Sequence, residues 1–531
     1  MITADRMAEV DRNAAALGVP RAKLMESSGN AVARVVREHA EPGASVTLLC
    51  GRGNNGGDAF VAARFLDEFD VRVVLLGRPE TISTEIARDN WAALQTAEIQ
   101  TRQVRDGSAF RPGDSSVGTD TERDGDTSGS ADAAESDGPL ADADVVVDAL
   151  LGTGVTGALR EPAATAARAV NRAGERGATV LSVDVPSGVD ADTGESAGVA
   201  VEPDAVVTFH DTKPGLRERA AADEFAVTVA DIGIPEAAER FVGPGDLRPL
   251  GRRRDSHKGD HGEVLVVGGG PYTGAPTLAA RAALRAGADL VRVAVPASIA
   301  REVQGFDESL IVRPYDGDRI GSETVETVLD LAEEQDTVVL GPGLGDAPET
   351  LTAVETFLDR YDGTAVVDAE ATRLVPEVTT DATLVCTPHR GEFAAMGGDP
   401  SGDWETRAAA VESFAAGLDA DATLVVTGPE DVISDGETTR ISRTGNPSMT
   451  VGGTGDVLAG VAGALTAVVD PARGASLAAW ATGRAGDTAA ETYGDGLVAT
   501  DLLPVLPSAL RDDETGSGGT GGRSDGSEGG R

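Results

Sequence analysis

Lysine is almost absent from this chain. Of its 531 residues only Lys23, Lys213 and Lys258 are lysines, and the remaining basic residues are arginines. Aromatic residues make up 3%, and 88 acidic against 45 basic side chains give a formal net charge of −43. Such a surface repels nucleic acid and anionic membranes, so we expect neither as a partner. It also repels itself, and because about 1 M salt shortens the Debye length to about 3 Å, the composition indicates adaptation to a salt-rich cytoplasm.

Cysteine and long apolar runs are scarce as well. Cys50 and Cys386 fall in separate apolar segments, which argues against a disulfide framework. No apolar run approaches the ~18 residues that a membrane span needs. The N-terminal stretch is charged and amphipathic and lacks a signal-peptide core. We therefore expect a soluble, cytoplasmic protein.

Two segments lack any hydrophobic periodicity. Residues 106–143 are rich in Asp, Ser, Gly and Thr, and the tail 511–531 has a similar composition. Both are predicted to be disordered. Strand-like residues resume directly after the first segment, so we interpret it as an insertion in a surface loop.

Elsewhere, apolar strand-like runs alternate with helical spacing, which predicts the α/β class with parallel sheets. A stretch rich in Pro, Gly and charge, 241–262, marks the expected boundary between a first domain, 1–240, and a second, 250–510. The strands expected in the first domain are 45–50, 70–77, 143–150, 178–186 and 203–209. Those expected in the second are 263–270, 288–296, 336–343, 364–370, 382–388 and 423–429.

The stretch CGRGNNGGDAF, residues 50–60, joins an expected strand to an expected helix. Glycines let the backbone approach a ligand closely, and the amides of a first helical turn attract anions. A tight turn without a ligand would need glycine but not Asn54, Asn55 and Asp58 together. Asp184 and Ser187 end another apolar strand, where an acid is costly unless it is solvated, paired or bound to a cation. Asp184 as a simple turn cap is an equally good interpretation of that loop alone.

The loops of the first half, together with LMESSGNAVA (24–33), closely resemble the NAD(P)H-hydrate epimerase domain of nicotinamide-nucleotide repair enzymes. The resemblance implies a Rossmann-like sheet, inversion at C6 of the hydrated nicotinamide ring, and a bound potassium ion. Asp184 would be the proton acceptor, and Asn55, Asp148 and Ser187 would help to hold potassium. The implied substrate-binding residues are Asn54, Asn55, Gly56, Gly57, Asp58, Gly152, Thr153, Gly154, Val155, Thr156, Gly157, Ala158 and Asp184.

In the second half, GNPSMTVGGTGDVLAG (445–460) places GGTGD before an apolar helix. The amides of that turn can form an anion hole for a transferring phosphoryl group, with Asp456 directed at the acceptor hydroxyl. For an isolated motif of this kind, a glycine-rich helix start with Asp456 interacting only with the helix dipole is equally consistent.

With GPGLG (341–345) and CTPHRGEF (386–393), the second half resembles the ADP-dependent NAD(P)H-hydrate dehydratases, which have a ribokinase-like α/β fold. The resemblance implies phosphorylation of the C6 hydroxyl by ADP, with magnesium, followed by elimination of phosphate. Asp456 would be the base. The implied hydrate-binding residues are Ala275, Gly345, His389 and Asp456. The implied nucleotide-binding residues are Thr427, Gly428, Pro429, Glu430, Asp431 and Gly455. His389 is also interpretable as a helix N-cap.

Three positions depart from the family pattern. Glu370 stands where the family has a shorter acid, Thr427 where it usually has a lysine near the nucleotide, and Ala59 where it commonly has glycine. The change at Thr427 removes a phosphate-binding charge and bears on nucleotide affinity.

The leading hypothesis is therefore a bifunctional repair enzyme, a homo-oligomer whose substrates are NADH-hydrate, NADPH-hydrate and ADP. One alternative is a small-molecule kinase fused to a dinucleotide-binding domain, which would release a stable phosphorylated product. Another is a binding module, because epimerase-like domains resemble some lipoprotein-binding and RNA-decapping scaffolds. Asp184 and the oxygen-bearing residues of the potassium site favour the enzyme.

Overall fold

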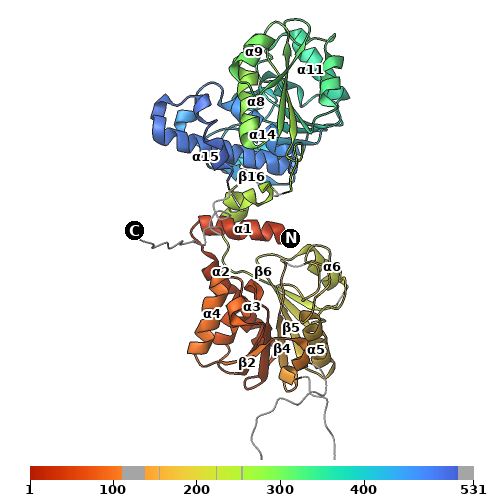
Figure 1. Cartoon of the computed structure of the whole chain (residues 1–531), viewed down its shortest axis with the longest axis vertical. Coiled ribbons are helices and arrows are strands. Elements are labelled where there is room, and N and C mark those ends of the chain that lie inside the picture. Colours follow the sequence, from red (N-terminus) through yellow and green to blue (C-terminus); the bar gives the residue numbers. More distant parts are fainter. Residues whose placement is uncertain (111–137, 155, 223, 253–254, 512–531) are drawn as a thin grey trace, which may run out of the picture. The chain divides into compact units, whose positions relative to one another are not determined.

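The computed structural model describes residues 1–110, 138–154, 156–222, 224–252 and 255–511. It contains two compact units, Met1–Pro235 and Glu236–Arg531, which Figure 1 colours from red to yellow and from green to blue. Each unit is an α/β structure around a largely parallel sheet, so the predicted fold class is confirmed. Most of the expected insertion and nearly all of the tail lie outside the described residues. No helix in the described ranges is both long and apolar enough to cross a membrane.

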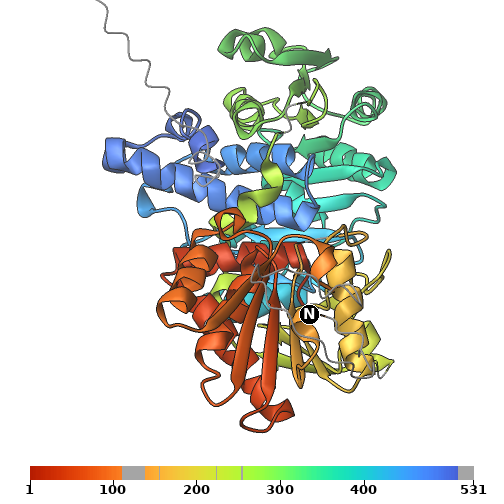
Figure 2. The same ribbon diagram turned by 60° about the horizontal axis from the view of Figure 1, so that its bottom comes forward.

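The first unit has a seven-stranded sheet in the order β3-β2-β1-β4-β5-β6-β7, with every pairing parallel. Its strands lie side by side in Figure 2. They are β1 (Ser45–Cys50), β2 (Asp70–Leu76), β3 (Gln100–Val104), β4 (Val145–Ala149), β5 (Thr179–Val183), β6 (Ala205–Phe209) and β7 (Ala226–Ala230). The five expected strands are the five inner ones. Both edge strands escaped prediction because they are polar: β3 buries only Val104 and β7 only Ala230.

Helices cover both faces of this sheet (Figure 1). One face packs on α5 through Ala166, Ala167 and Val170. The helices α2 and α3 pack on each other and against the central strands, including β1 and β5. The helices of the unit are α1 (Ala4–Ala16), α2 (Arg21–His39), α3 (Asn54–Arg64), α4 (Glu85–Thr96), α5 (Ala163–Glu175) and α6 (Pro214–Ala221).

The flanks of the expected insertion are ordered, which corrects the prediction for those residues. Short 3₁₀ turns span Gly107–Phe110 and Gly138–Leu140. Phe110 and Leu140 are fully buried in the core beneath α5. The two flanks also meet, since a Cβ on Gly138 would lie 1.9 Å from the carbonyl oxygen of Ala109. Two apolar side chains within an acidic, glycine-rich stretch were enough to anchor its ends.

The second unit has a nine-stranded sheet in the order β10-β9-β8-β11-β12-β13-β14-β15-β16, of which β10 to β14 pair in parallel and the last two pairings are antiparallel. The strands are β8 (Glu263–Val267), β9 (Leu290–Pro296), β10 (Ile311–Tyr315), β11 (Thr337–Leu340), β12 (Thr364–Val367), β13 (Thr383–Cys386), β14 (Ala422–Val426), β15 (Asp431–Ser434) and β16 (Thr439–Ser442). Again the inner parallel strands are those expected. The edge strands β10 and β16 were not expected, nor was β15, which lies between β14 and β16.

Side chains alternate between two cores along the inner strands of this unit. Val264 and Val266 of β8 face one core, and Leu265 and Val267 face the other. Burial on both faces explains why these strands are continuous apolar runs. The helices are α7 (Ala237–Arg240), α8 (Gly274–Ala286), α9 (Ala300–Phe306), α10 (Val325–Ala332), α11 (Pro348–Arg360), α12 (Arg390–Ala395), α13 (Trp404–Ala415), α14 (Thr454–Thr466), α15 (Pro471–Tyr493) and α16 (Leu506–Ala509).

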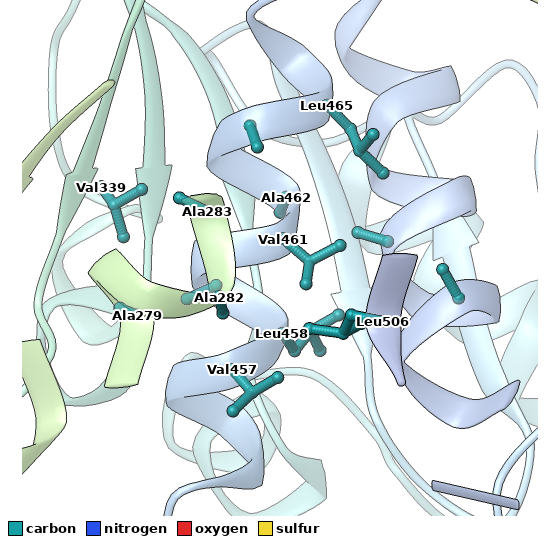
Figure 3. Close-up of a cluster of buried hydrophobic side chains, with 14 of the residues drawn as sticks. Ala279, Ala282, Ala283, Val339, Val457, Leu458, Val461, Ala462, Leu465 and Leu506 are labelled. Carbon is teal, nitrogen blue, oxygen red and sulfur yellow. The ribbon is translucent and has the colours of Figure 1, made fainter. Parts of the chain in front are cut away.

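The crossing of α8 and α14 fixes the helix that carries Asp456. A Cβ on Gly460 would lie 2.0 Å from the carbonyl oxygen of Ala279, so only glycine permits this approach. Figure 3 shows Val457, Leu458 and Val461 of α14 packed in the core beside α8. The buried stripe of α14 thereby holds its first turn in place.

The unit boundary falls earlier than the 241–262 stretch that we expected. Val242 N–H donates to the carbonyl oxygen of Ile441 at 2.9 Å, and Arg440 pairs with the buried Asp246 at 3.0 Å. Residues from Glu236 onward therefore belong to the second unit. The charged residue Asp246 of this stretch forms an ion pair with Arg440 of β16. The amino-acid composition of the stretch does not reveal this contact.

Candidate functional site

In the first unit, the loops that follow β1, β4, β5 and β6 meet at the carboxyl edge of the sheet. The chain order reverses between β1 and β4, which is where open α/β sheets form their ligand crevice. A cavity of about 680 Å³ lies there. Its walls include Asn54, Asn55, Gly152 and Asp184. The sequence motifs singled out in the first half therefore converge on one cavity.

Asp184 is paired with a buried lysine. Lys213 Nζ lies 2.7 Å from Asp184 Oδ1, and the lysine side chain has no exposed surface. The ammonium group also donates to Thr208 Oγ1 at 2.8 Å and to the carbonyl oxygen of Phe209 at 3.0 Å. Three acceptors around one ammonium group make this a fully satisfied buried charge. Asp184 remains 15% exposed and lines the cavity, so its carboxylate faces both the lysine and the cavity.

The backbone of Asp184 is in the left-handed conformation, which residues other than glycine rarely adopt. Its φ is +64°, directly after β5, while its N–H still donates to the carbonyl oxygen of Val207. Strained backbone at a strand end that faces a cavity is typical of functional sites. Asp11 of α1 also lines the cavity, and burial, opposed mainly by Arg21 and assisted by Asp184, raises its pKa to about 6.

Asp148 and Ser187 are linked beneath this cavity. Ser187 donates to the Asp148 carboxylate through its hydroxyl at 2.7 Å and through its N–H at 2.9 Å, and Ser182 Oγ donates at 3.0 Å. Asp148 is fully buried, and burial raises its pKa, against the effect of these hydrogen bonds. No cationic side chain pairs with Asp148 in the described ranges.

Asn55 completes this group of oxygens. Its amide nitrogen donates to the carbonyl oxygen of Leu151 at 2.9 Å, and the same carbonyl accepts from Ser187 Oγ at 3.3 Å. Asn55 Oδ1 is buried and has no hydrogen-bond partner among the described residues. An unsatisfied oxygen beside a carbonyl, a hydroxyl and a carboxylate is the donor set of a hard cation. Among the same residues no group of three His, Cys, Asp or Glu side chains is arranged so that it could hold a metal ion.

Some residues of the glycine-rich turn after β1 line the cavity, and others pack within α3. Asn54, Asn55 and Asp58 line the cavity. Gly56 and Gly57 do not, because they are buried within α3: a Cβ on Gly56 would lie 2.2 Å from the carbonyl oxygen of Gly51, and one on Gly57 would lie 2.8 Å from the side chain of Met25. The structure thus gives these two glycines a packing role, and their predicted contact with substrate stays a prediction.

Asp58 is held by α2. Ser28 Oγ donates to Asp58 Oδ1, and burial raises the pKa of Asp58 well above its usual value. A Cβ on the neighbouring Gly29 would lie 2.4 Å from the side chain of Val61 and 2.7 Å from the carbonyl oxygen of Asp58, so this glycine permits the close contact between α2 and α3. The SSGN motif therefore positions an acid in the cavity wall.

The predicted substrate loop 152–158 spans two adjoining cavities. Gly152, Thr153 and Gly154 line the first cavity. Gly154 also lines a second cavity of about 560 Å³, together with Thr156 and Ala158. Gly157 lines neither, and Val155 lies outside the described residues.

In the second unit, Asp456 lies in the first turn of α14. The preceding Gly453 is the N-cap of α14 and has a φ of +95°. The N–H groups of the first helical turn, which follows it, have no partners within the helix. Burial, and secondarily the negative charge of Asp368, raise the pKa of Asp456 to about 7. A carboxyl group that titrates near neutrality is suited to general base catalysis. Gly455, predicted to lie at the nucleotide phosphates, is exposed in the same turn.

Asp368 follows β12 and was not among the predicted site residues. It accepts a hydrogen bond from Thr387 Oγ1 at 2.7 Å, and burial raises its pKa to about 6. The next residue, Ala369, has a φ of +54°. Glu370, the longer acid noted in the sequence, is half-exposed and pairs with Arg373. The acid whose charge raises the pKa of Asp456 is thus Asp368, whereas Glu370 forms an ion pair with its neighbour Arg373.

His389 is the N-cap of α12. Its Nδ1 accepts from the N–H groups of Gly391 at 2.9 Å and Glu392 at 3.1 Å, and Glu392 accepts from the N–H of His389 at 2.8 Å. The capping interpretation is confirmed, and Nε2 of the exposed ring lies 3.7 Å from Oε1 of Glu392.

Ala275 and Gly345 come from neighbouring loops. Ala275 lies in the first turn of α8 and touches the 341–345 loop, where a Cβ on Gly343 would be 3.1 Å from its methyl group. Gly345 has a φ of +75° and lies against Pro271. The two predicted hydrate-binding positions therefore lie on loops that pack together. Their role in binding stays a prediction.

The predicted nucleotide loop connects β14 to β15. Thr427 N–H donates to the carbonyl oxygen of Pro388 at 3.1 Å, which brings it beside His389. Asp431 accepts from Gly428 N–H at 3.0 Å, and Glu430 is held by the buried Arg407 at 3.1 Å. The two acids thus shape the turn around Pro429.

Comparison with known proteins covers nearly the whole chain. Residues 21–215 match the family model described as YjeF-related protein N-terminus, and residues 264–508 match NAD(P)H-hydrate dehydratase. The chain is 42% identical to the bifunctional NAD(P)H-hydrate repair enzyme Nnr of Methanothermobacter thermautotrophicus, over 95% of this chain and 94% of that one. It is also 42% identical to the Nnr enzyme of Archaeoglobus fulgidus, over 96% and 98% of the two chains.

The chain belongs to the bifunctional NAD(P)H-hydrate repair enzymes. The family resemblance inferred from the motifs is therefore confirmed. Among solved structures, the ADP/ATP-dependent NAD(P)H-hydrate dehydratase of Bacillus subtilis is 24% identical and aligns with a TM-score of 0.45, covering 51% of this chain and 97% of that one.

For this repair enzyme, sequence reasoning missed Lys213, Asp11, Ser28 and Asp368. Lys213 carried a signal that was available, because it is one of three lysines and lies in the motif TFHDTKPGL (208–216). Ser28 lies inside the quoted motif LMESSGNAVA, but its role was not assigned; Asp11 and Asp368 carried no local signal, since their importance depends on packing between segments distant in the sequence.

Proposed function

We propose that this chain restores hydrated NADH and NADPH in two steps. The first unit interconverts the R and S hydrates, and the second uses ADP to dehydrate the S hydrate, releasing AMP and phosphate. The observation that carries the proposal is the pairing of Asp184 with Lys213 at the edge of a cavity in a chain of this family. A module that only binds partners has no need of a buried ion pair facing a cavity.

Epimerisation requires a base next to C6. We assign this role to Asp184, which accepts the proton of the C6 hydroxyl as C6 and its oxygen become a carbonyl group and the electron pair of the C6–N1 bond goes to N1. N1 then attacks the opposite face of that carbonyl, and Asp184 returns the proton to the oxygen. No atom is gained or lost. Lys213 holds the Asp184 carboxyl group in one orientation, because its ammonium group lies 2.7 Å from Asp184 Oδ1. Asn54 and Asp58 in the cavity wall would orient the ribose and its phosphates.

The oxygens of Asn55, Asp148 and Ser187 fit a potassium ion. The fit rests on the unpartnered Asn55 Oδ1, the shared carbonyl of Leu151 and the buried carboxylate of Asp148. When bound, potassium would supply positive charge beside the phosphates of the substrate. The protein groups themselves fix the loops after β1, β4 and β5 relative to one another.

Dehydration requires a better leaving group than hydroxide. Asp456 is assigned to remove the proton of the C6 hydroxyl, whose oxygen then attacks the β-phosphorus of ADP and displaces AMP. Elimination breaks the C6–O bond, the phosphate leaves with that electron pair, and a proton is lost from C5 as the C5–C6 double bond forms. The amides at the start of α14 are positioned to stabilise the transferring group. Magnesium would enter with the phosphates of ADP and neutralise part of their charge.

We further propose a salt-rich cytoplasm as the working environment, which the net charge of −43 supports. Association into a homo-oligomer stays a prediction.

The test is incubation of a chemically prepared mixture of R and S hydrates with the protein and ADP in high salt. Recovery of absorbance at 340 nm with stoichiometric phosphate release is expected. Asp456→Asn should abolish both while the R and S forms still interconvert, as followed by chromatography. Asp184→Asn should consume only the S fraction and then stall at the spontaneous rate.

A stable phosphorylated product without recovery of absorbance would instead support a small-molecule kinase. Loss of both activities from either single substitution would contradict two independent sites.

A further inference from the structure

The second cavity of the first unit is lined by three arginines. Arg52 follows β1, Arg105 follows β3, and Arg160 lies in the loop after β4. All three sit at the carboxyl edge of the sheet, where ligands of open α/β sheets bind. At about 560 Å³, the cavity falls within the range of small-molecule sites.

None of these guanidinium groups has an ion-pair or hydrogen-bond partner in the described part of the chain. Elsewhere in the same unit, Arg37 and Arg64 pair with carboxylates. The carboxylate in the cavity lining, Glu161, is engaged by Thr165 at 2.7 Å and Arg168 at 3.4 Å. In a protein with 88 acidic residues, three arginines without acidic partners around one cavity leave their charge available for an anionic ligand.

The arginine cavity adjoins the cavity that contains Asp184. Leu150, Leu151 and Gly154 line both. Arg52 lies across the backbone at the end of β2, since a Cβ on Gly77 would be 2.6 Å from Arg52 Cδ. One extended ligand lying along the edge of the sheet can therefore touch Asp184 with one end and the arginines with the other.

We propose that the arginine cavity binds the adenosine half of the substrate and that Arg52, Arg105 and Arg160 recognise the 2′-phosphate of NADPH-hydrate. This inference rests on the proposed function. The glycine loops account for the pyrophosphate, and adenine and ribose are uncharged, so the 2′-phosphate is the remaining anion on that half. Dinucleotide sites that prefer a free 2′-hydroxyl place an acid after the second strand, whereas Gly77 and Arg78 follow β2 in this chain.

The preference for NADPH-hydrate is measured as the ratio of the kcat/KM values for the two hydrates. The epimerase is expected to convert NADPH-hydrate with a kcat/KM at least about tenfold above that for NADH-hydrate at low salt, because guanidinium–phosphate bonds are charge-assisted. Arg52→Gln and Arg105→Gln should each reduce this ratio, and together they should reduce it further, with Arg160 supplying the preference that remains. Arg102→Gln is the matched control: Arg102 is an exposed arginine of β3 that does not line the cavity. It should leave the ratio unchanged.

A binding measurement separates recognition from catalysis. Calorimetry on the full chain should show that adenosine 2′,5′-bisphosphate binds the first unit more tightly than 5′-AMP, and that Arg52→Gln with Arg105→Gln reduces this difference. Equal kcat/KM for both hydrates in an active wild-type epimerase would overturn the inference and leave the proposed function standing. A preference that is undiminished in the double variant would overturn the role of the arginines. Inactivity toward both hydrates would overturn the proposed function itself.

Discussion

Lys213 Nζ lies 2.7 Å from Asp184 Oδ1, and the lysine is the fully buried member of the pair. The other two lysines of the chain, Lys23 and Lys258, are exposed. A composition that has replaced lysine by arginine almost everywhere has kept it here, where a compact ammonium group meets three acceptors. The planar, longer guanidinium of arginine does not match that arrangement.

Lys213→Met should lower the kcat of the epimerase by at least about 100-fold and leave KM nearly unchanged, because Lys213 does not line the cavity. Removing one partner of a buried pair also costs about 3–5 kcal/mol of stability. Thermal unfolding must therefore be measured beside the kinetics, and the dehydratase serves as an internal standard. Lys23→Met, an exposed lysine of α2, is the control. Proportional loss of both activities would reduce Lys213 to a purely structural residue.

The dehydratase rate should rise with pH through about 7, the pKa to which burial and Asp368 raise Asp456. Below that pH the base form falls about tenfold per unit, and above it the rate should level off. Asp368→Asn removes a nearby negative charge, so the midpoint should move to lower pH. The measurement is phosphate release at saturating ADP from pH 5 to 9. A midpoint that does not respond to Asp368→Asn would argue against this coupling.

Potassium should raise both epimerase activity and the melting temperature of the first unit. We expect the effect when choline is exchanged for potassium at constant ionic strength. Asn55→Ala removes the unpartnered Oδ1 and should increase the potassium concentration for half-effect in both measurements. Asn54→Ala is the comparison, because Asn54 Oδ1 already accepts from Thr84. Identical potassium curves for the wild type and Asn55→Ala would exclude Asn55 as a ligand.

Deleting residues 112–136 behind a short linker should leave both activities nearly unchanged, since Ala109 and Gly138 already meet and loop length costs only ~0.6 kcal/mol per doubling. Deleting 106–141 removes Phe110 and Leu140 from the core and should destabilise the first unit by about 3–5 kcal/mol or more. The interpretation of 106–143 as a disordered insertion in a surface loop would make the longer deletion harmless as well. Urea denaturation of the two variants distinguishes these outcomes.

Thr427→Lys should lower the KM for ADP clearly at low salt and only slightly at high salt. A lysine near the phosphates contributes about 1–3 kcal/mol through a charge-assisted hydrogen bond, and salt screens that contribution. The comparison must be made under conditions in which the acidic chain is still folded. An equal gain at every salt concentration would indicate a specific buried contact. No gain would mean that Thr427 does not occupy the place of the lysine.

The inner strands of both sheets were predictable because burial on two faces produces continuous apolar runs such as Val145–Ala149. The edge strands were not, since one exposed face leaves β3 with the sequence QTRQV. The same limit applied to the site. Asp184 and Asp456 carry motifs, whereas the partnership of Ser28 with Asp58 depends on the packing of α2 against α3, which no local pattern records.

The position of β1 third from one edge of its sheet bears on how the protein is made. Between the end of β1 at Cys50 and the start of β4 at Val145, the ribosome must add a stretch that takes about 5–20 s at typical rates. During that time one edge of β1 has no β4 to pair with, and the synthesis of residues 111–137 lengthens this interval. An unpaired apolar edge invites pairing with another nascent chain. The acidic charge that accumulates on each growing chain opposes such encounters before the sheet is complete.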